Sequence, residues 1–244
     1  MIILFFLTVS SPASAVERGA LTIAAASDLS YALREITGLF YEETGVKAAV
    51  SFGSTGMLAA QIRHGAPFDV FLSADLRHIE DLEKGGFIIS GTAGSFAEGA
   101  LAIASNKSTG IIVNDINGLL DKRIRRVAIA NPAHAPYGRA GVEALKNFGV
   151  WDVVKDKLIY GENVRQAMQF IETGDADAGI VALSIANVPG IRYAKVSTAL
   201  HSPIRQTAGA VKGAKEEANA RAFIAFLKGP KAWDVLRRYG FLVP

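Results

Sequence analysis

Residues 128–145, with the sequence AIANPAHAPYGRAGVEAL, decide the expected fold. The stretch begins inside a short apolar strand at 127–130, which ends before Pro132. After Tyr137-Gly138 the chain continues as a helix, because its apolar residues recur with helical spacing at Ala140, Ala144, Leu145 and Phe148. A strand that feeds a turn and then a helix leaves the first N–H groups of that helix without partners, next to the positive end of the helix dipole. The stretch therefore predicts a site for a small oxyanion that no formal positive charge touches.

Three similar units occupy the first part of the chain. Expected strands at 21–26, 46–52 and 70–72 are each followed by a polar turn and a helix. Successive strand–turn–helix units predict a parallel sheet covered by helices. Ligands of such sheets bind at the carboxyl ends of the strands, which is where the turns Ser27-Asp28 and 53–56 are expected.

A second set of units begins at residue 125 and shares this style without being a sequence repeat. It contains a helix entered through Asn163-Val164 and an expected strand at 178–183. The chain then returns through an expected strand at 208–211 to two amphipathic helices at its end.

Little linker-like sequence separates the two sets. We therefore expect an α/β protein with two lobes, each a mainly parallel sheet flanked by helices, and with hinge strands between the lobes. Lobe I is expected to comprise residues 16–98 and 207–244, and lobe II residues 99–206.

The composition is that of an ordinary globular protein, with half of the residues hydrophobic and a fifth charged. The net charge of +3 is too small to indicate nucleic-acid binding. The absence of cysteine excludes disulfides, thiolate zinc sites, iron–sulfur clusters, cysteine nucleophiles and an N-terminal lipid anchor on cysteine.

The N-terminus has the pattern of a cleaved export signal. An apolar run at 2–9 precedes the small-residue motif Ala13-Ser14-Ala15, although no Lys or Arg stands before the run. The run is too short to cross a bilayer as a helix. We expect residues 1–15 to be a signal peptide and the mature protein to be periplasmic and not lipid-anchored.

Four turns are candidates for one shared binding site. Two belong to the first half of the chain and two to the second, so a cleft between lobes would bring them together: Ser27-Asp28, Ser54-Thr55, Tyr137-Gly138 and Asn163-Val164. Taken singly, each Ser or Thr is more simply explained as a helix cap. Spacing in the sequence does not by itself make the four turns converge.

Motifs for other chemistry are missing. The four histidines do not have metal-ligand spacing, and neither G-x-S-x-G nor G-x-x-x-x-G-K-[ST] occurs. No acid, base or nucleophile converges on the four turns, so we expect no catalytic residue, no resident metal and no cofactor.

The chain resembles the periplasmic molybdate-binding proteins of ABC importers, which are type II periplasmic-binding proteins. The resemblance rests on motifs spread over nearly the whole mature chain in the family's order: 24–29 (AAASDL), 51–56 (SFGSTG), 65–75 (GAPFDVFLSAD), 130–138 (ANPAHAPYG), 161–164 (GENV), 179–181 (GIV) and 238–241 (RYGF).

The resemblance also implies the residues of the site. Ser27 should donate through its hydroxyl and N–H, as should Thr55, which stands where the family usually has serine. Tyr137 and Val164 should donate backbone N–H groups. Two further candidates carry less weight: Ser54, and Asp28, whose side chain should turn away so that only its N–H approaches the anion.

One family position differs in this chain. Some members place a tyrosine where Ala182 stands, whereas a subgroup instead has a tyrosine in the Pro-Tyr-Gly turn, as Tyr137 does here. The resemblance places the chain in that subgroup.

The implied function is capture of molybdate or tungstate by neutral hydrogen-bond donors and delivery to the membrane permease of an ABC importer, by a protein expected to be a monomer. Alternatives are a receptor for another oxyanion, such as sulfate or phosphate, and an enzyme on the same fold.

Overall fold

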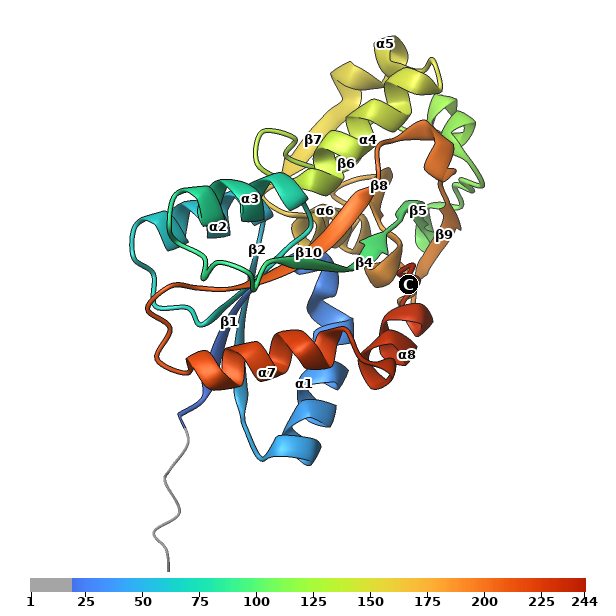
Figure 1. Cartoon of the computed structure of the whole chain (residues 1–244). Coiled ribbons are helices and arrows are strands. Elements are labelled where there is room, and N and C mark those ends of the chain that lie inside the picture. Colours follow the sequence, from blue (N-terminus) through green and yellow to red (C-terminus); the bar gives the residue numbers. More distant parts are fainter. Residues whose placement is uncertain (1–18) are drawn as a thin grey trace, which may run out of the picture.

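The computed structural model describes residues 19–244, and the predicted signal peptide at 1–15 lies outside the described residues. These residues form two five-stranded sheets, each flanked by helices, so the molecule has two α/β lobes (Figure 1). No helix between residues 19 and 244 has both the length and the apolar character that crossing a membrane requires.

The first sheet has the order β2-β1-β3-β10-β4. Strands β1, β2 and β3 are parallel, and β10 runs antiparallel to both of its neighbours. The strands are β1 (Leu21–Ala26), β2 (Ala48–Gly53), β3 (Val70–Ser73), β4 (Gly94–Gly99) and β10 (Ile204–Ala210).

The second sheet repeats this arrangement, in the order β7-β6-β8-β5-β9. Strand β6 is parallel to β7 and β8, and β5 is antiparallel to β8 and β9. The strands are β5 (Leu101–Asn106), β6 (Val127–Ala130), β7 (Leu158–Gly161), β8 (Ala178–Ala182) and β9 (Ile191–Lys195).

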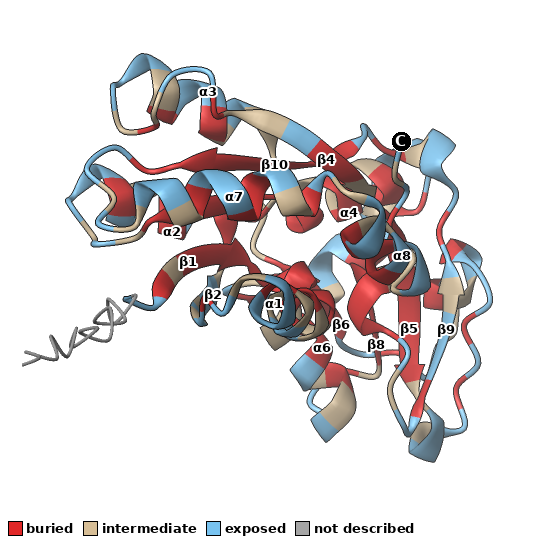
Figure 2. Ribbon diagram, turned by 60° about the horizontal axis from the view of Figure 1, so that its bottom comes forward, coloured by how far each residue is buried: buried red, intermediate tan, exposed pale blue. Residues whose placement is uncertain are grey.

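Helices cover both faces of the first sheet. Side chains of β1 alternate between two apolar clusters: Ile23 and Ala25 pack with α1, α7 and α8, whereas Ala24 packs with α2 and α3. Figure 2 shows buried strands beneath helices whose outer faces are exposed. These helices are α1 (Ser30–Thr44), α2 (Thr55–Arg63), α3 (Leu76–Lys84), α7 (Glu217–Leu227) and α8 (Pro230–Arg238).

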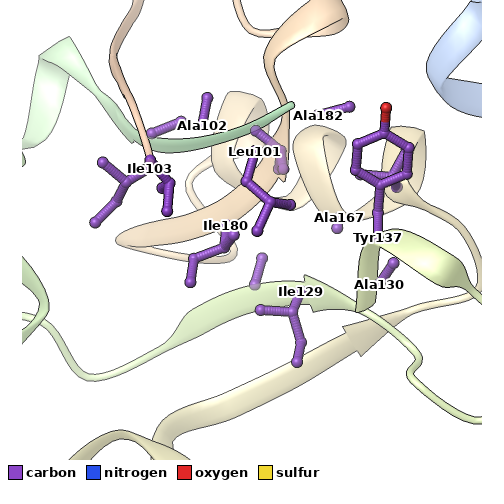
Figure 3. Close-up of a cluster of buried hydrophobic side chains, with 14 of the residues drawn as sticks. Leu101, Ala102, Ile103, Ile129, Ala130, Tyr137, Ala167, Ile180 and Ala182 are labelled. Atoms are coloured by element: carbon purple, nitrogen blue, oxygen red, sulfur yellow. The ribbon is translucent and has the colours of Figure 1, made fainter. Parts of the chain in front are cut away.

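A single apolar cluster stabilises the second sheet. Figure 3 shows Leu101, Ile103, Ile129 and Ile180 at its centre, with the ring of Tyr137 at one side. The helices of this lobe are α4 (Pro136–Asn147), α5 (Trp151–Val154) and α6 (Val164–Thr173). Short 3-10 helices are η1 (Ser27–Leu29), η2 (Lys107–Thr109), η3 (Ile116–Leu120), η4 (Lys155–Lys157), η5 (Leu183–Ile185) and η6 (Thr198–Leu200).

The chain crosses between the sheets near Ala100 and again before Ile204. Strand β4 leads directly into β5 of the other sheet, and β10 returns antiparallel to β4 (Figure 1). These crossings bring the carboxyl ends of the parallel strands of both sheets toward each other.

Several elements differ from the sequence-based expectations. Strands β4 and β7 and the short helix α5 were not predicted, because GSFAEG, LIYG and WDVV are too short or too rich in glycine to show a period. Strand β10 begins at Ile204 instead of residue 208, since it buries polar side chains, Gln206 and Thr207, that hid its first half.

The expectation that Ser27 and Asp28 cap a helix was also wrong. They form the first residues of η1, whose N-cap is Ala26, and no side chain caps either η1 or α1. Asp75, in contrast, caps α3 through a bond from the N–H of Arg77 to its carboxylate (2.9 Å).

Candidate functional site

The carboxyl ends of five parallel strands, three from the first sheet and two from the second, surround a small cavity between the lobes. The open space, including its mouth toward solvent, is about 190 Å³. It is lined by Ala26, Ser27, Asp28, Gly53, Ser54, Thr55, Ala74, Ala135, Pro136, Tyr137 and Val164.

All six residues singled out from the sequence line this cavity. Ser27 and Asp28 follow β1, Ser54 and Thr55 follow β2, Tyr137 lies in the first turn of α4, and Val164 begins α6. The structure thus brings together four turns that are far apart in the sequence. Their contact with a ligand remains a prediction.

In the part of the chain that the structure describes, several backbone N–H groups in the first turns of the helices around the cavity have no hydrogen-bond acceptor. At α6 the Asn163 side chain accepts the N–H groups of Arg165 (3.0 Å) and Gln166 (3.1 Å), which leaves the N–H of Val164. At α2 the N–H of Gly56 donates across the cleft to the carbonyl oxygen of His134 (2.9 Å). Within residues 19–244, the N–H groups of Thr55, Tyr137 and Val164 have no acceptor.

The two predicted hydroxyl ligands both act as acceptors elsewhere. Thr55 Oγ1 accepts the N–H of Ala74 (3.1 Å), and Ser27 Oγ accepts the N–H of Arg165 from the other lobe (3.4 Å). A hydroxyl has one donor hydrogen in addition to its acceptor lone pairs, so both O–H groups remain able to donate into the cavity.

Ser54 has a different role from an ordinary cap. It is the N-cap of α2, but its side chain makes no cap bond, because Oγ lies 2.9 Å from Nδ1 of His134 in the other lobe. His134 Nε2 also lies 3.7 Å from a carboxylate oxygen of Glu162. The contacts of His134 therefore join the two lobes at the edge of the cavity.

The side chain of Asp28 makes contacts that the sequence did not indicate. Its side chain is buried and spans the lobes, because Oδ2 accepts the hydroxyl of Tyr137 (3.0 Å) and Nε2 of Gln206 (2.8 Å). Burial raises the pKa of the Asp28 carboxyl to about 7, against the lowering effect of these two bonds and of the backbone N–H of Asp28 itself. Burial and the nearby Asp28 also hold the pKa of the Tyr137 hydroxyl well above its usual value.

Sequence reasoning missed three contributors to this arrangement. Gln206 lies inside β10, the Tyr137 hydroxyl was not assigned a role, and Ser184 Oγ donates to the carbonyl oxygen of Asp28 (2.7 Å). No local pattern marks these residues, because each acts on a residue more than 60 positions away.

The cavity wall contains no Lys, Arg or His among the described residues that line it. The nearby guanidinium groups are paired elsewhere, that of Arg165 with Glu172 (2.8 Å) and that of Arg139 with Asp75. Within residues 19–244 no group of His, Asp and Glu has the arrangement of a metal site. The wall therefore offers mainly neutral hydrogen-bond donors, which suit an anion better than a cation.

Glycine at position 56 is required by the close approach of the two lobes. A Cβ atom there would lie 2.8 Å from the carbonyl oxygen of His134, which is closer than real Cβ contacts. A side chain at this position would force apart the cleft that its N–H bond closes.

Two α/β lobes with a polar cavity at their junction define a binding protein that holds a small solute between its lobes. The chain belongs to the family described as bacterial extracellular solute-binding protein, whose match covers residues 21–242. The family membership and the two-lobed α/β fold expected from the motifs are thereby confirmed.

Named relatives share most of the chain. The molybdate-binding protein ModA of Azotobacter vinelandii is 37% identical over 242 residues, which cover 94% of this chain and 92% of the relative. ModA of Rhodobacter capsulatus is 36% identical over 92% of this chain and 88% of its own length. The solved periplasmic molybdate-binding protein of A. vinelandii has a TM-score of 0.85 at 33% identity, covering 92% of this chain and 99% of that one.

Proposed function

We propose that this protein captures molybdate, or the equally shaped tungstate, between its lobes and delivers it to the membrane permease of an ABC importer. Ser27 and Thr55 donate through hydroxyl and N–H groups, and Tyr137 and Val164 donate through N–H groups. Ser54 positions the cleft through His134, and the N–H of Asp28 is a further donor. The family membership and the ModA relatives support this proposal.

The observation that carries the proposal is a cavity at the start of several helices with no cationic side chain on its wall. A fully deprotonated tetrahedral dianion can use donors only, and N–H and O–H groups supply them. Hydrogen bonds to a charged group contribute about 1.5–3 kcal/mol each. About six such hydrogen bonds outweigh the free-energy cost of dehydrating the anion and closing the lobes. The remaining free energy corresponds to a dissociation constant of about micromolar or below.

Selection among oxyanions follows from the size of the cavity. Sulfate is a smaller tetrahedron than molybdate and cannot reach all donors of a cavity set for the larger ion. Tungstate is nearly the same size as molybdate and should bind about as well. The protein performs no chemistry on its ligand and acts as a monomeric periplasmic receptor, not attached to lipid. Lobe I is proposed to contain the first sheet and lobe II the second, so the boundary expected at 206/207 moves to the start of β10 at Ile204.

Isothermal titration calorimetry with molybdate, tungstate, sulfate and phosphate tests the substrate assignment. We expect saturable binding of molybdate and tungstate with one site per chain, and little or no heat from sulfate or phosphate. If sulfate or phosphate saturates the protein at lower concentration than molybdate, the protein is a receptor for that other oxyanion.

A matched pair of variants tests the site. Thr55→Ala removes a hydroxyl donor and should weaken molybdate binding about tenfold, whereas Thr55→Ser keeps the hydroxyl and should bind within about threefold of the parent. The Ala variant also loses the bond from the Ala74 N–H, so its unfolding should be measured beside its affinity. Equal affinity in all three proteins would remove Thr55 from the site.

A further inference from the structure

The two carboxyl oxygens of Asp28 have different surroundings. Oδ2 accepts bonds from the Tyr137 hydroxyl and from Nε2 of Gln206, whereas Oδ1 is buried and has no hydrogen-bond partner within residues 19–244. A buried oxygen without a partner is costly and unusual in folded proteins. Asp28 is one of the residues that line the cavity, so a ligand bound there would lie next to Asp28.

Oδ1 is also the oxygen that can carry a proton. Oδ2 already accepts two bonds, and a proton on it would compete with one of them. A proton on Oδ1 disturbs neither bond and converts an acceptor into an O–H donor. The hydrogen bonds to Oδ2 thus favour protonation at Oδ1, the oxygen that lacks a partner.

No cation offsets a negative charge on Asp28. The elements next to it are α1, α6 and η5, which pack against η1, and α4 and β10, which supply Tyr137 and Gln206. Arg165 pairs with Glu172, Arg139 with Asp75, and Arg205 lies 4.0 Å from Glu98. The other titratable groups on these elements are Tyr31, Arg34, Glu35, Tyr41, Glu42 and Glu43 on α1, Tyr137, Glu143 and Lys146 on α4, and Glu172 on α6.

A carboxylate in this position would repel a dianion in the same cavity. Burial, which outweighs the hydrogen bonds to the carboxyl, raises the pKa of Asp28 to about 7 in the empty protein, and a bound dianion would raise it further. Tyr137 stays a neutral donor, since its pKa is also raised.

We propose that Asp28 is a further ligand residue, which binds the oxyanion as a neutral carboxylic acid whose Oδ1–H donates to an anion oxygen, the proton being taken up from water on binding. The proposal adds a side-chain contact to the contact from the Asp28 N–H, and it rests on the proposed function. It also bears on specificity: a pocket of donors only fits a fully deprotonated oxyanion, whereas hydrogen phosphate has an O–H of its own that needs an acceptor.

Calorimetry of molybdate binding in two buffers with different ionisation enthalpies, at pH 8.5, tests the proposal, because molybdate stays a dianion there. Asp28 is mostly ionised in the empty protein at this pH, so we expect uptake of close to one proton per anion. The affinity should fall about tenfold per pH unit between pH 8 and 9, since each binding event consumes a proton that becomes scarcer.

Asp28→Asn is the matched variant, because its carbonyl oxygen can accept from Tyr137 and Gln206 while its NH₂ group replaces the Oδ1–H donor. It should bind molybdate without proton uptake and with affinity constant within about twofold from pH 7 to 9. His134→Gln removes the imidazole at the cavity edge, keeps a polar side chain opposite Ser54, and should keep the proton uptake.

The outcomes separate this inference from the function on which it rests. Saturable molybdate binding by the unaltered protein without proton uptake at pH 8.5 overturns the role of Asp28 and leaves the receptor function standing. Loss of proton uptake in His134→Gln also overturns it. Absence of molybdate binding at every pH overturns the proposed function itself.

Discussion

Asp28 and Asp75 occupy comparable places and have opposite chemistry. Each follows a parallel strand of the first sheet, β1 or β3, and each reaches across the cleft to α4, Asp28 to Tyr137 and Asp75 to Arg139 two positions later. Burial raises the pKa of Asp28 to about 7. Burial also acts to raise the pKa of Asp75, but its contacts with His78, Arg77 and Arg139 outweigh burial and hold it well below the usual value.

The difference shows how the cleft is divided. Asp28 lines the small cavity, whose described wall holds no cationic side chain, whereas Asp75 lines a larger groove with Arg77, Arg139 and Arg205. Ala74 and Pro136 line both spaces and separate them. The ion pairs of Asp75 thus lie next to the proposed anion site and outside its wall, where they can hold the lobes together without binding the anion directly.

The largest expected difference between Asp28 and Asp75 lies in how the free energy of unfolding of the empty protein depends on pH. The pKa of Asp28 is about 7 in the folded protein, raised from 3.8. The free energy of unfolding that neutral Asp28 contributes is therefore fully present below about pH 4 and is lost as the pH rises through 7. Relative to Asp28→Asn, the unaltered protein should lose roughly 4 kcal/mol of unfolding free energy between pH 4 and 8. Urea denaturation at each pH measures this, and parallel curves for the two proteins would contradict it.

The contribution of Asp75 to the free energy of unfolding should rise with pH, opposite to that of Asp28, and should be smaller. Its lowered pKa means that its contribution is complete above about pH 4 and lost as the pH falls further. At pH 7, Asp75→Ala should cost about 2 kcal/mol, from the loss of the α3 cap and of partly exposed ion pairs. Asp75→Asn keeps a good cap residue and isolates the charge, so it should cost less. A destabilisation of Asp75→Asn that does not shrink at acid pH would be inconsistent with a charge effect.

Arg139 provides the smallest of the three effects, on ligand affinity. Its ion pair with Asp75 joins α4 to the start of α3 and exists only while the lobes are in contact. Arg139→Gln should therefore weaken molybdate binding about threefold to tenfold, or about 1 kcal/mol. Arg77→Gln removes a guanidinium on the same carboxylate and within one lobe, 71% exposed, and should leave the affinity nearly unchanged. Equal losses in the two variants would indicate that net charge, and not the interlobe pair, is responsible.

Much of the fold was predictable from the sequence. The units around β1, β3 and β6 and the helices α1, α3, α4 and α6 show clear periodicity and stops, because burial of one face fixes the spacing of apolar residues. Strands β4 and β7 were not predictable, since they are short and glycine-containing and are paired by distant segments instead of by their own pattern.

The candidate site was predicted as four separate turns, and the family resemblance supplied their common purpose. Ser27, Thr55 and Tyr137 were found because a strand end followed by a helix start leaves a local signature, and Val164 was found from its helix start alone. Their convergence on one cavity depends on the two chain crossings near residues 100 and 204, which no local pattern encodes.

The sequence by itself determined the supply of uncharged donors, since the residue types at the four turns and the lack of cationic side chains there are fixed in the chain. The tertiary structure alone decided the state of Asp28, because the same carboxyl would have an ordinary pKa in an exposed turn. Only folding removes it from water, surrounds it with Tyr137 and Gln206 from distant segments, and leaves one oxygen without a partner. The physical reason is that desolvation depends on what packs around a group in space, whereas helix starts and apolar periods depend on neighbours along the chain.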